Sequence, residues 1–218
     1  MKQKSHNPKY TLEIHLTDKK SNYNNILFSS NYTVNPMGLA VVNSESDAIN
    51  LYQSDQPYAH LQEAKNMETT LDNYLTSTEG QNFMNYVSSR GKKMMNIKGV
   101  GAGDLGENTV AALLHDGIEG IILSNYAGKS FSERVSDFAG SYGLDPQSAE
   151  EYVLAHELSH AAGNFTEESA ESFLEDYFTK MASQNEGEEK VRYESLAVVA
   201  GKRKEEAAKI ENNYQNAA

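Results

Sequence analysis

Residues 145–171 read DPQSAEEYVLAHELSHAAGNFTEESAE, and this stretch decides the fold. Asp145 is a good N-cap and Pro146 a good first helical residue, so a helix is expected to begin here. Gly163 stands where that helix should stop, and Thr166 can cap a following helix whose first turn is acidic. Because Gly163 would reverse the chain, the two helices are predicted to form a hairpin.

The first of these helices carries the motif His156-Glu157-Leu158-Ser159-His160. Histidines four residues apart lie on one helix face, and two imidazoles at that spacing can hold one Zn²⁺. Glu157 projects beside such a metal rather than onto it, where it can take a proton from water and pass it to a leaving amine. Chance matches to the motif in this composition number about 0.02. The motif therefore predicts a catalytic zinc site with His156 and His160 as ligands.

A zinc peptidase needs a third protein ligand and one position open to water. No histidine follows His160, and Thr166 stands where a longer motif would place its third imidazole, so an acid must serve. Of the acids in the second helix, Glu167 projects nearest to the apolar face. In a hairpin Glu167 falls opposite His160, and Glu171 falls opposite His156. We predict that Glu167 is the third ligand and that Glu171 orients His156 through its other ring nitrogen. The reverse assignment, with Glu171 on the metal, stays open.

The motif and the later string Glu167-Glu168-Ser169-Ala170-Glu171 resemble the zincin metallopeptidases, and among them the gluzincins. The resemblance covers roughly residues 115–180. It implies a zincin-like α+β fold, with a small mixed sheet packed on an active-site helix and a glutamate helix. It also implies that a downstream glutamate completes the zinc site. Only six residues separate His160 from Glu167, fewer than in most gluzincins, which favours a compact version of the scaffold.

The same resemblance implies an edge strand, upstream of the active-site helix, that pairs with extended substrate. We place this strand at Gly117–Ser124, and its site residues are Gly120, Ile121 and Ile122. The same residues could also form a core strand, and the two interpretations are compatible. An oxyanion-stabilising side chain is expected beyond the glutamate helix, where the available candidates are Tyr177, Arg192 and Tyr193.

The chain as a whole is predicted to have three parts, which are an N-terminal region over 1–92, a catalytic core over 93–183 and a polar helical tail over 184–218. The first part would add an α/β region that serves as a pro-segment, an upper subdomain or a substrate-docking region. Its alternating and periodic patterns predict short strands at Thr11–Asp18, Ile26–Phe28 and Leu39–Val42, and helices near 58–75 and 83–87.

Two further stretches are interpreted as lacking a functional role. The glycine-rich residues 99–106 are expected to form a plain flexible loop, because no Gly-Lys-Ser/Thr follows and the nearby acids would repel phosphate. Residues 195–213 have helix-forming composition, and the mixed charges at 202–206 are typical of a solvated helix face.

The composition excludes several classes of function. The chain has 218 residues, and 19 Lys and Arg against 31 Asp and Glu give a net charge of −12. Phosphate backbones and anionic headgroups repel such a chain, so nucleic-acid and membrane partners are not expected. It has no Cys, which excludes disulfides, thiol catalysis and cysteine zinc sites. With no secretory signal and no apolar run near the roughly 20 residues of a membrane span, we expect a soluble, cytoplasmic protein.

These features favour a zinc endopeptidase that hydrolyses protein or peptide substrates, with Zn²⁺ as its cofactor. The alternative is a catalytically inactive zincin-like module that binds a partner through the same groove. The intact Glu157 argues against that alternative, because a binding domain does not need this acid. A metal-dependent hydrolase acting on something other than peptides is a third hypothesis.

Overall fold

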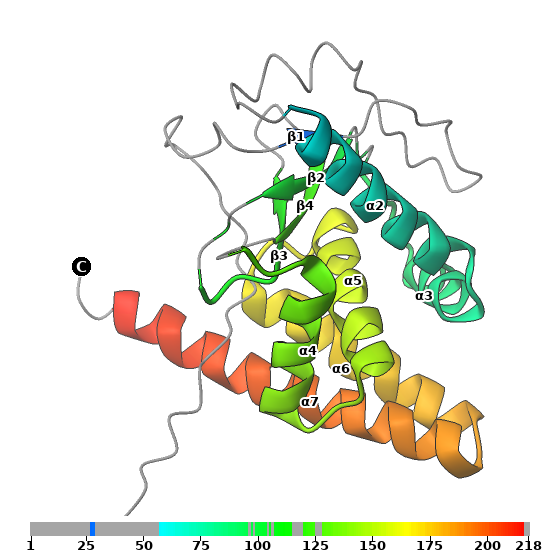
Figure 1. Ribbon diagram of the computed structural model, residues 1–218. Coiled ribbons are helices and arrows are strands. Elements are labelled where there is room, and N and C mark those ends of the chain that lie inside the picture. Colours follow the sequence, from blue (N-terminus) through cyan, green and yellow to red (C-terminus); the bar gives the residue numbers. More distant parts are fainter. Residues whose placement is uncertain are drawn as a thin grey trace, which may run out of the picture.

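A computed structural model describes Leu27–Phe28 and residues 57–215, apart from residues 96, 98, 104, 106, 115–119 and 125–127. Within these residues the protein combines a small mixed sheet with a larger set of helices, as the predicted α+β class requires (Figure 1). The elements in chain order are β1 (Leu27–Phe28), α2 (Pro57–Thr76), α3 (Thr78–Ser89), β2 (Gly99–Gly103), β3 (Ala111–Leu114), β4 (Gly120–Ser124), α4 (Phe131–Tyr142), α5 (Pro146–Ala161), α6 (Glu167–Gln184) and α7 (Gly187–Gln215).

The sheet has the order β1-β2-β4-β3, so β4 lies inside it. β4 pairs in parallel with β2 and antiparallel with β3, and Ile121 stands between Val100 and Leu113. The prediction that Gly120, Ile121 and Ile122 form a free edge for substrate is therefore wrong, because both sides of their strand are already paired. The apolar run that suggested this strand is typical of a central strand, which is buried by its neighbours. Among the described strands, β3 is the outermost one on this side.

The glycine-rich stretch that was expected to be a flexible loop contains β2. This strand pairs with β1 on one side and with β4 on the other, and α2 packs against it. Val100 is fully buried and Gly101 is buried beside it. Glycine in a strand often marks a close approach of another backbone, and here the paired neighbours supply the order that the side chains do not.

The helical hairpin that contains the motif is formed as predicted. Asp145 caps α5 by accepting a hydrogen bond from the Ser148 amide, and Thr166 caps α6 in a reciprocal capping box with Ser169. Between the two helices, Gly163 takes a φ of 91°, which only glycine adopts without strain. Nearly every residue of α5 from Ser148 onward is buried, since α2, α3, α4, α6, α7 and β3 all contact it. The motif therefore lies on the central helix of the molecule.

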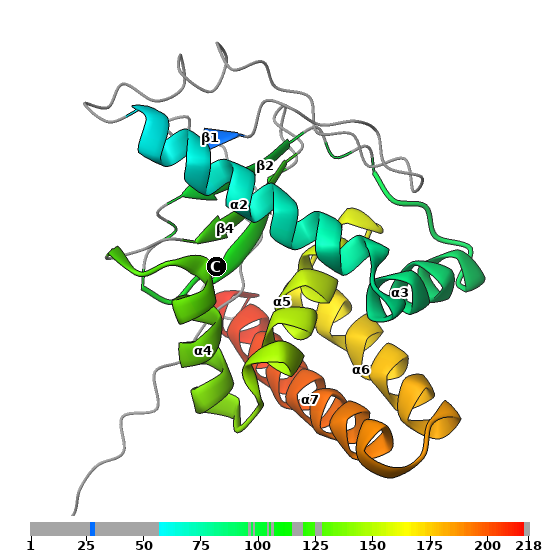
Figure 2. The same ribbon diagram turned by 45° about the vertical axis from the view of Figure 1, so that its right-hand side comes forward.

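The C-terminal residues do not form a solvated tail. α7 packs along α6 as a hairpin, and both views show the two helices side by side (Figures 1 and 2). Its inner face is a buried stripe made of Tyr193, Leu196, Val199, Ala200, Arg203 and Ala207. One hydrophobic cluster extends from Met67 in α2 to Ala200 in α7. The expected boundaries after residues 92 and 183 therefore do not separate packing units in the described part of the chain.

The N-terminal predictions are tested only in part. α2 and α3 confirm the two helices, and Met67, Leu71 and Leu75 are buried at the predicted spacing. β1 confirms the strand at Leu27–Phe28. The strands expected at Thr11–Asp18 and Leu39–Val42 lie outside the described residues. No helix in the described ranges is both long and apolar enough to cross a bilayer.

Candidate metal centre

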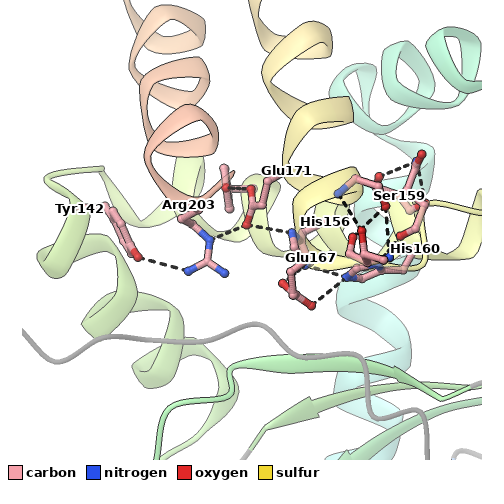
Figure 3. A network of polar contacts seen from close by, with 11 residues as sticks. Tyr142, His156, Ser159, His160, Glu167, Glu171 and Arg203 are labelled. Atoms are coloured by element: carbon pink, nitrogen blue, oxygen red, sulfur yellow. Dashed lines mark hydrogen bonds and ion pairs between the residues drawn. The ribbon is translucent and has the colours of Figure 1, made fainter. Parts of the chain in front are cut away.

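Three side chains from α5 and α6 converge at the hairpin (Figure 3). The Nε2 atoms of His156 and His160 are 2.9 Å apart. The Glu167 carboxylate faces both, with Oε2 3.3 Å from His156 Nε2 and Oε1 3.3 Å from His160 Nε2. The hairpin thus brings together the three residues that the sequence selected as ligands.

The spacing of these donor atoms suits a small cation. Ligands about 2.0–2.1 Å from a tetrahedral zinc ion lie roughly 3.3 Å from one another, which the two histidine–carboxylate distances of 3.3 Å match. Each of His156, His160 and Glu167 offers one ligand atom, and these three atoms lie within 4.8 Å of one another. Two imidazoles and one carboxylate are also a donor set that zinc prefers in catalytic sites. These residues could hold one metal ion.

The tautomer of His160 is fixed by its second nitrogen. Its Nδ1 lies 2.6 Å from the carbonyl oxygen of Asn164, and since a carbonyl only accepts, Nδ1 must carry the proton. The Nε2 lone pair therefore points toward Glu167 and His156. Asn164 is itself held by its side-chain amide, which donates to the Ser159 carbonyl oxygen at 3.0 Å and to the Ser159 hydroxyl at 2.9 Å. We did not select Asn164 or Ser159 from the sequence, although an asparagine directly after the turn glycine is a visible signal.

His156 is oriented from the other side by Glu171. Its Nδ1 lies 3.3 Å from Glu171 Oε1, which is an ion-pair contact without the geometry of a hydrogen bond. The same carboxylate accepts a 2.6 Å hydrogen bond from Arg203 Nε and a hydrogen bond from the Tyr152 hydroxyl. Arg203 also donates to Tyr142 at 3.2 Å, so α4, α5, α6 and α7 all take part (Figure 3).

Arg203 and Tyr152 were missed by the sequence analysis, but both had a signal. Tyr152 precedes His156 by four residues and so lies on the same face of α5. Arg203 falls in the apolar stripe of α7, at a position where a charged residue is unusual. A cation at a buried helix position implies a buried acid opposite it, and that acid is Glu171.

The electrostatics of the cluster favour charged carboxylates. Burial alone would raise the pKa of Glu171, but the guanidinium of Arg203 and the His156 imidazole hold it below its usual range. Burial likewise opposes ionisation of Glu167, and His156 and His160 hold its pKa well below normal. Burial would lower the pKa of His156, but the two carboxylates raise it to about 10. The pKa of His160 is lowered by burial and by the charge on His156. The carboxylates of Glu167 and Glu171 are therefore charged, and they stabilise the protonated form of His156 between them.

Glu157 has a different environment from the other two glutamates. It is 1% exposed, and neither of its carboxylate oxygens finds a hydrogen-bond partner among the described residues. Burial raises its pKa to about 8, although the nearby charge of His156 and the backbone of Leu113 in β3 act against this. A buried carboxyl without a partner is unusual, and such groups often have a catalytic role.

The three candidates for an oxyanion-stabilising residue are not brought to this cluster. Arg192 forms an ion pair with Glu151, and the Tyr177 hydroxyl donates a hydrogen bond of 3.3 Å to the carbonyl oxygen of Glu79. Tyr193 is buried, and the Arg192 guanidinium lies 4.5 Å from its ring centroid. The prediction placed these residues by their order in the chain, which does not determine which face of α6 or α7 they occupy.

Comparisons of this chain with protein families, with curated proteins and with solved structures found no match.

Proposed function

We propose that the protein is a zinc-dependent metallopeptidase of the zincin type, similar to the gluzincins, that cleaves peptide bonds within protein or peptide substrates. The observation that carries the proposal is one arrangement of four side chains. Two histidine Nε2 atoms and the Glu167 carboxylate converge within ion-binding distance, and the buried Glu157 carboxyl has no partner among the described residues. A metal-binding site alone would not require that acid.

In this proposal His156, His160 and Glu167 hold the metal. A bound zinc ion supplies a Lewis acid that polarises the scissile carbonyl and lowers the pKa of water. The residues of the chain determine how that chemistry is directed. Asn164 and Glu171 face the Nδ1 atoms of the two histidines, and so would keep the Nε2 atoms directed at the site.

Glu157 acts as the general base and then as the general acid. Its carboxylate accepts a proton from the attacking water, and it delivers that proton to the nitrogen of the leaving amine. Its burial supports this role, because no side chain among the described residues hydrogen-bonds to the carboxylate.

The substrate would bind beside β3 rather than beside β4. β3 is the outermost described strand on this side of the sheet, it contacts α5, and Leu113 acts on Glu157 through its backbone. An extended peptide could pair with its outer side by strand addition, which places a peptide bond near Glu157 without dependence on a particular side chain.

Glu171 is a poor candidate for the third ligand. Both of its oxygens already accept hydrogen bonds, from Arg203 and from Tyr152. Glu167 is 22% exposed, and of its two oxygens one faces His156 and the other faces His160.

The ligand assignment predicts the metal content of three proteins. Elemental analysis of the purified chain should find about one zinc per molecule. Glu167→Ala should lose most of this zinc, because one of three ligands is removed. Glu168→Ala is the matched control, since its exposed side chain lies one residue away, and it should keep the metal. If Glu167→Ala retains zinc and Glu171→Ala loses it, the third ligand is Glu171.

The activity is tested with an unstructured protein as substrate. Hydrolysis should occur with zinc, stop when a chelator removes the metal, and return when zinc is restored. A protein that binds one zinc but cleaves none of a broad set of unfolded and peptide substrates would instead be the non-hydrolytic module.

A further inference from the structure

A second buried polar cluster lies between α5 and α7, away from the metal centre. Glu151 on α5 is 4% exposed, and its Oε2 accepts a hydrogen bond from Arg192 Nη1 on α7. Its other oxygen, Oε1, is buried without a hydrogen-bond partner in the described part of the chain. Oε1 is therefore removed from water without gaining a hydrogen bond, which disfavours the charged form of the Glu151 carboxyl.

Arg192 is also shared among several acids. Its Nη2 lies 2.8 Å from Glu189 Oε2 and 3.7 Å from Glu79 Oε1, so three carboxylates surround one guanidinium. Glu79 and Glu189 both raise the pKa of Glu151. The cluster carries more negative than positive charge, and Arg192 keeps other acceptors when Glu151 is neutral.

The other groups that face Glu151 are tyrosines. They are Tyr74 of α2, Tyr177 of α6 and Tyr193 of α7, and burial, followed by the charge of Glu151, raises the pKa of each. The Tyr74 hydroxyl is buried and, like Glu151 Oε1, finds no hydrogen-bond partner among the described residues. These hydroxyls are neutral near pH 7, so they do not offset the excess of negative charge.

The comparison with Glu171 shows what is unusual about Glu151. Arg192 and Arg203 are eleven residues apart on α7, which puts them within about 20° of each other around the helix, and each meets a buried carboxylate. Glu171 accepts hydrogen bonds at both oxygens and its pKa is lowered. Glu151 accepts only at Oε2, and burial raises its pKa to about 7 despite Arg192. Of these two buried arginine–carboxylate contacts of α7, one has a carboxylate that accepts hydrogen bonds at both oxygens and the other a carboxylate that accepts at only one.

We propose that Glu151 is a proton-uptake site that makes the packing of α7 on α5 sensitive to pH in the neutral range. The inference does not depend on peptide hydrolysis, since the cluster shares no residue with the metal centre. As the pH rises, the proton leaves and a charged carboxylate with one unpaired oxygen stays buried between the helices.

The sign of the effect follows from linkage. The folded pKa of about 7 exceeds the ordinary value of 4.5, so the folded protein binds this proton more tightly than the unfolded chain. The resulting stability is fully present below pH 4.5 and is lost as the pH rises through 7. Between pH 6 and pH 8 this group should raise the unfolding equilibrium constant roughly tenfold.

The experiment compares the unaltered protein with Glu151→Gln, which keeps the shape but cannot ionise. Denaturant unfolding of both proteins is measured from pH 5.5 to 8.5 at one zinc concentration. The ratio of their unfolding constants then cancels the titrations of the groups that they share. The unfolding constant of the unaltered protein, divided by that of the variant, should rise about tenfold from pH 6 to pH 8. Glu188→Gln is the control, because this acid lies on the same helix as Arg192 with an exposed side chain, and its profile should follow the unaltered protein. A ratio that is constant, or that falls with pH, overturns the proposal.

A second measurement does not require the variant to fold. The side-chain carboxyl carbon of Glu151 in ¹³C-labelled protein, assigned through bonds, should titrate with a midpoint near pH 7. A midpoint below about pH 5, near the ordinary value for glutamate, overturns the proposal.

Discussion

Glu157→Gln is expected to lower the rate of peptide hydrolysis by about 10²–10⁴-fold, the usual contribution of a general acid–base residue, without loss of zinc. The amide has nearly the shape of the carboxyl but cannot accept the proton of water. Zinc should stay, because the proposed ligands His156, His160 and Glu167 are unchanged. The measurements are the hydrolysis rate of an unstructured protein and the metal content of the same sample.

The variant should also fold normally, which separates a chemical defect from a structural one. Glu157 is 1% exposed, and no side chain among the described residues hydrogen-bonds to its carboxylate, so its replacement by glutamine breaks no side-chain hydrogen bond. Replacing a buried group that can be charged with a neutral one is neutral or stabilising in such surroundings. Denaturant unfolding should therefore show no loss of stability.

Glu150→Gln is the matched control for this variant. Glu150 lies on α5, one position before Glu151, and is only half-buried. The same chemical change there should leave the rate within about twofold of the unaltered protein, because Glu150 is not part of the metal centre. Full activity in Glu157→Gln would contradict the proposed mechanism.

The helical hairpin could be predicted from the sequence because its determinants are local. Asp145 and Thr166 cap their own helices, and Gly163 provides the turn between them. Once two helices are known to be antiparallel, the 3.6-residue period decides which side chains face each other. This is why Glu167 and Glu171 could be placed opposite the two histidines before any coordinates were considered.

The predictions that were wrong concern contacts between distant parts of the chain. The residues of β4 are typical of a strand, but nothing within them shows that β2 and β3 pair on its two sides. β2 has little side-chain signal of its own, since glycines fill three of its five positions and its order comes from its neighbours. Pairing of strands that are separated in sequence is decided by the whole sheet, which a local pattern does not contain.

The role of α7 was missed for a related reason. Its charged residues at 202–206 were interpreted as one solvated set, although the helix period separates them. Arg203 is 5% exposed and faces the core, whereas the Lys204 side chain beside it is 34% exposed. The neighbours of Arg203 in the stripe, such as Val199 and Ala207, are apolar, so the period of the buried residues was the more informative signal.

Arg203→Met is expected to reduce the stability of the protein by about 3–5 kcal/mol, because the buried Glu171 would lose its cation. Methionine keeps most of the apolar volume of the arginine side chain, so the effect reports the charge rather than a cavity. Zinc affinity should fall by about 10–100-fold, since Glu171 would no longer be held against His156. Denaturant unfolding of the metal-free protein measures the first effect, and a competition titration with a zinc-binding dye measures the second.

Two further variants distinguish positioning of His156 from simple stabilisation by Arg203. Lys204→Met removes the adjacent cation, whose partner Glu175 is itself 36% exposed, and this should change stability by about 1 kcal/mol or less. In the double variant Arg203→Met with Glu171→Gln, no buried charge is left alone, so most of the lost stability should return. Zinc affinity should stay low in that double variant, because an uncharged amide is a weaker acceptor for the Nδ1 proton of His156 than a carboxylate. If the double variant recovers both stability and zinc affinity, the carboxylate of Glu171 does not position His156, and Arg203 serves only to neutralise a buried charge.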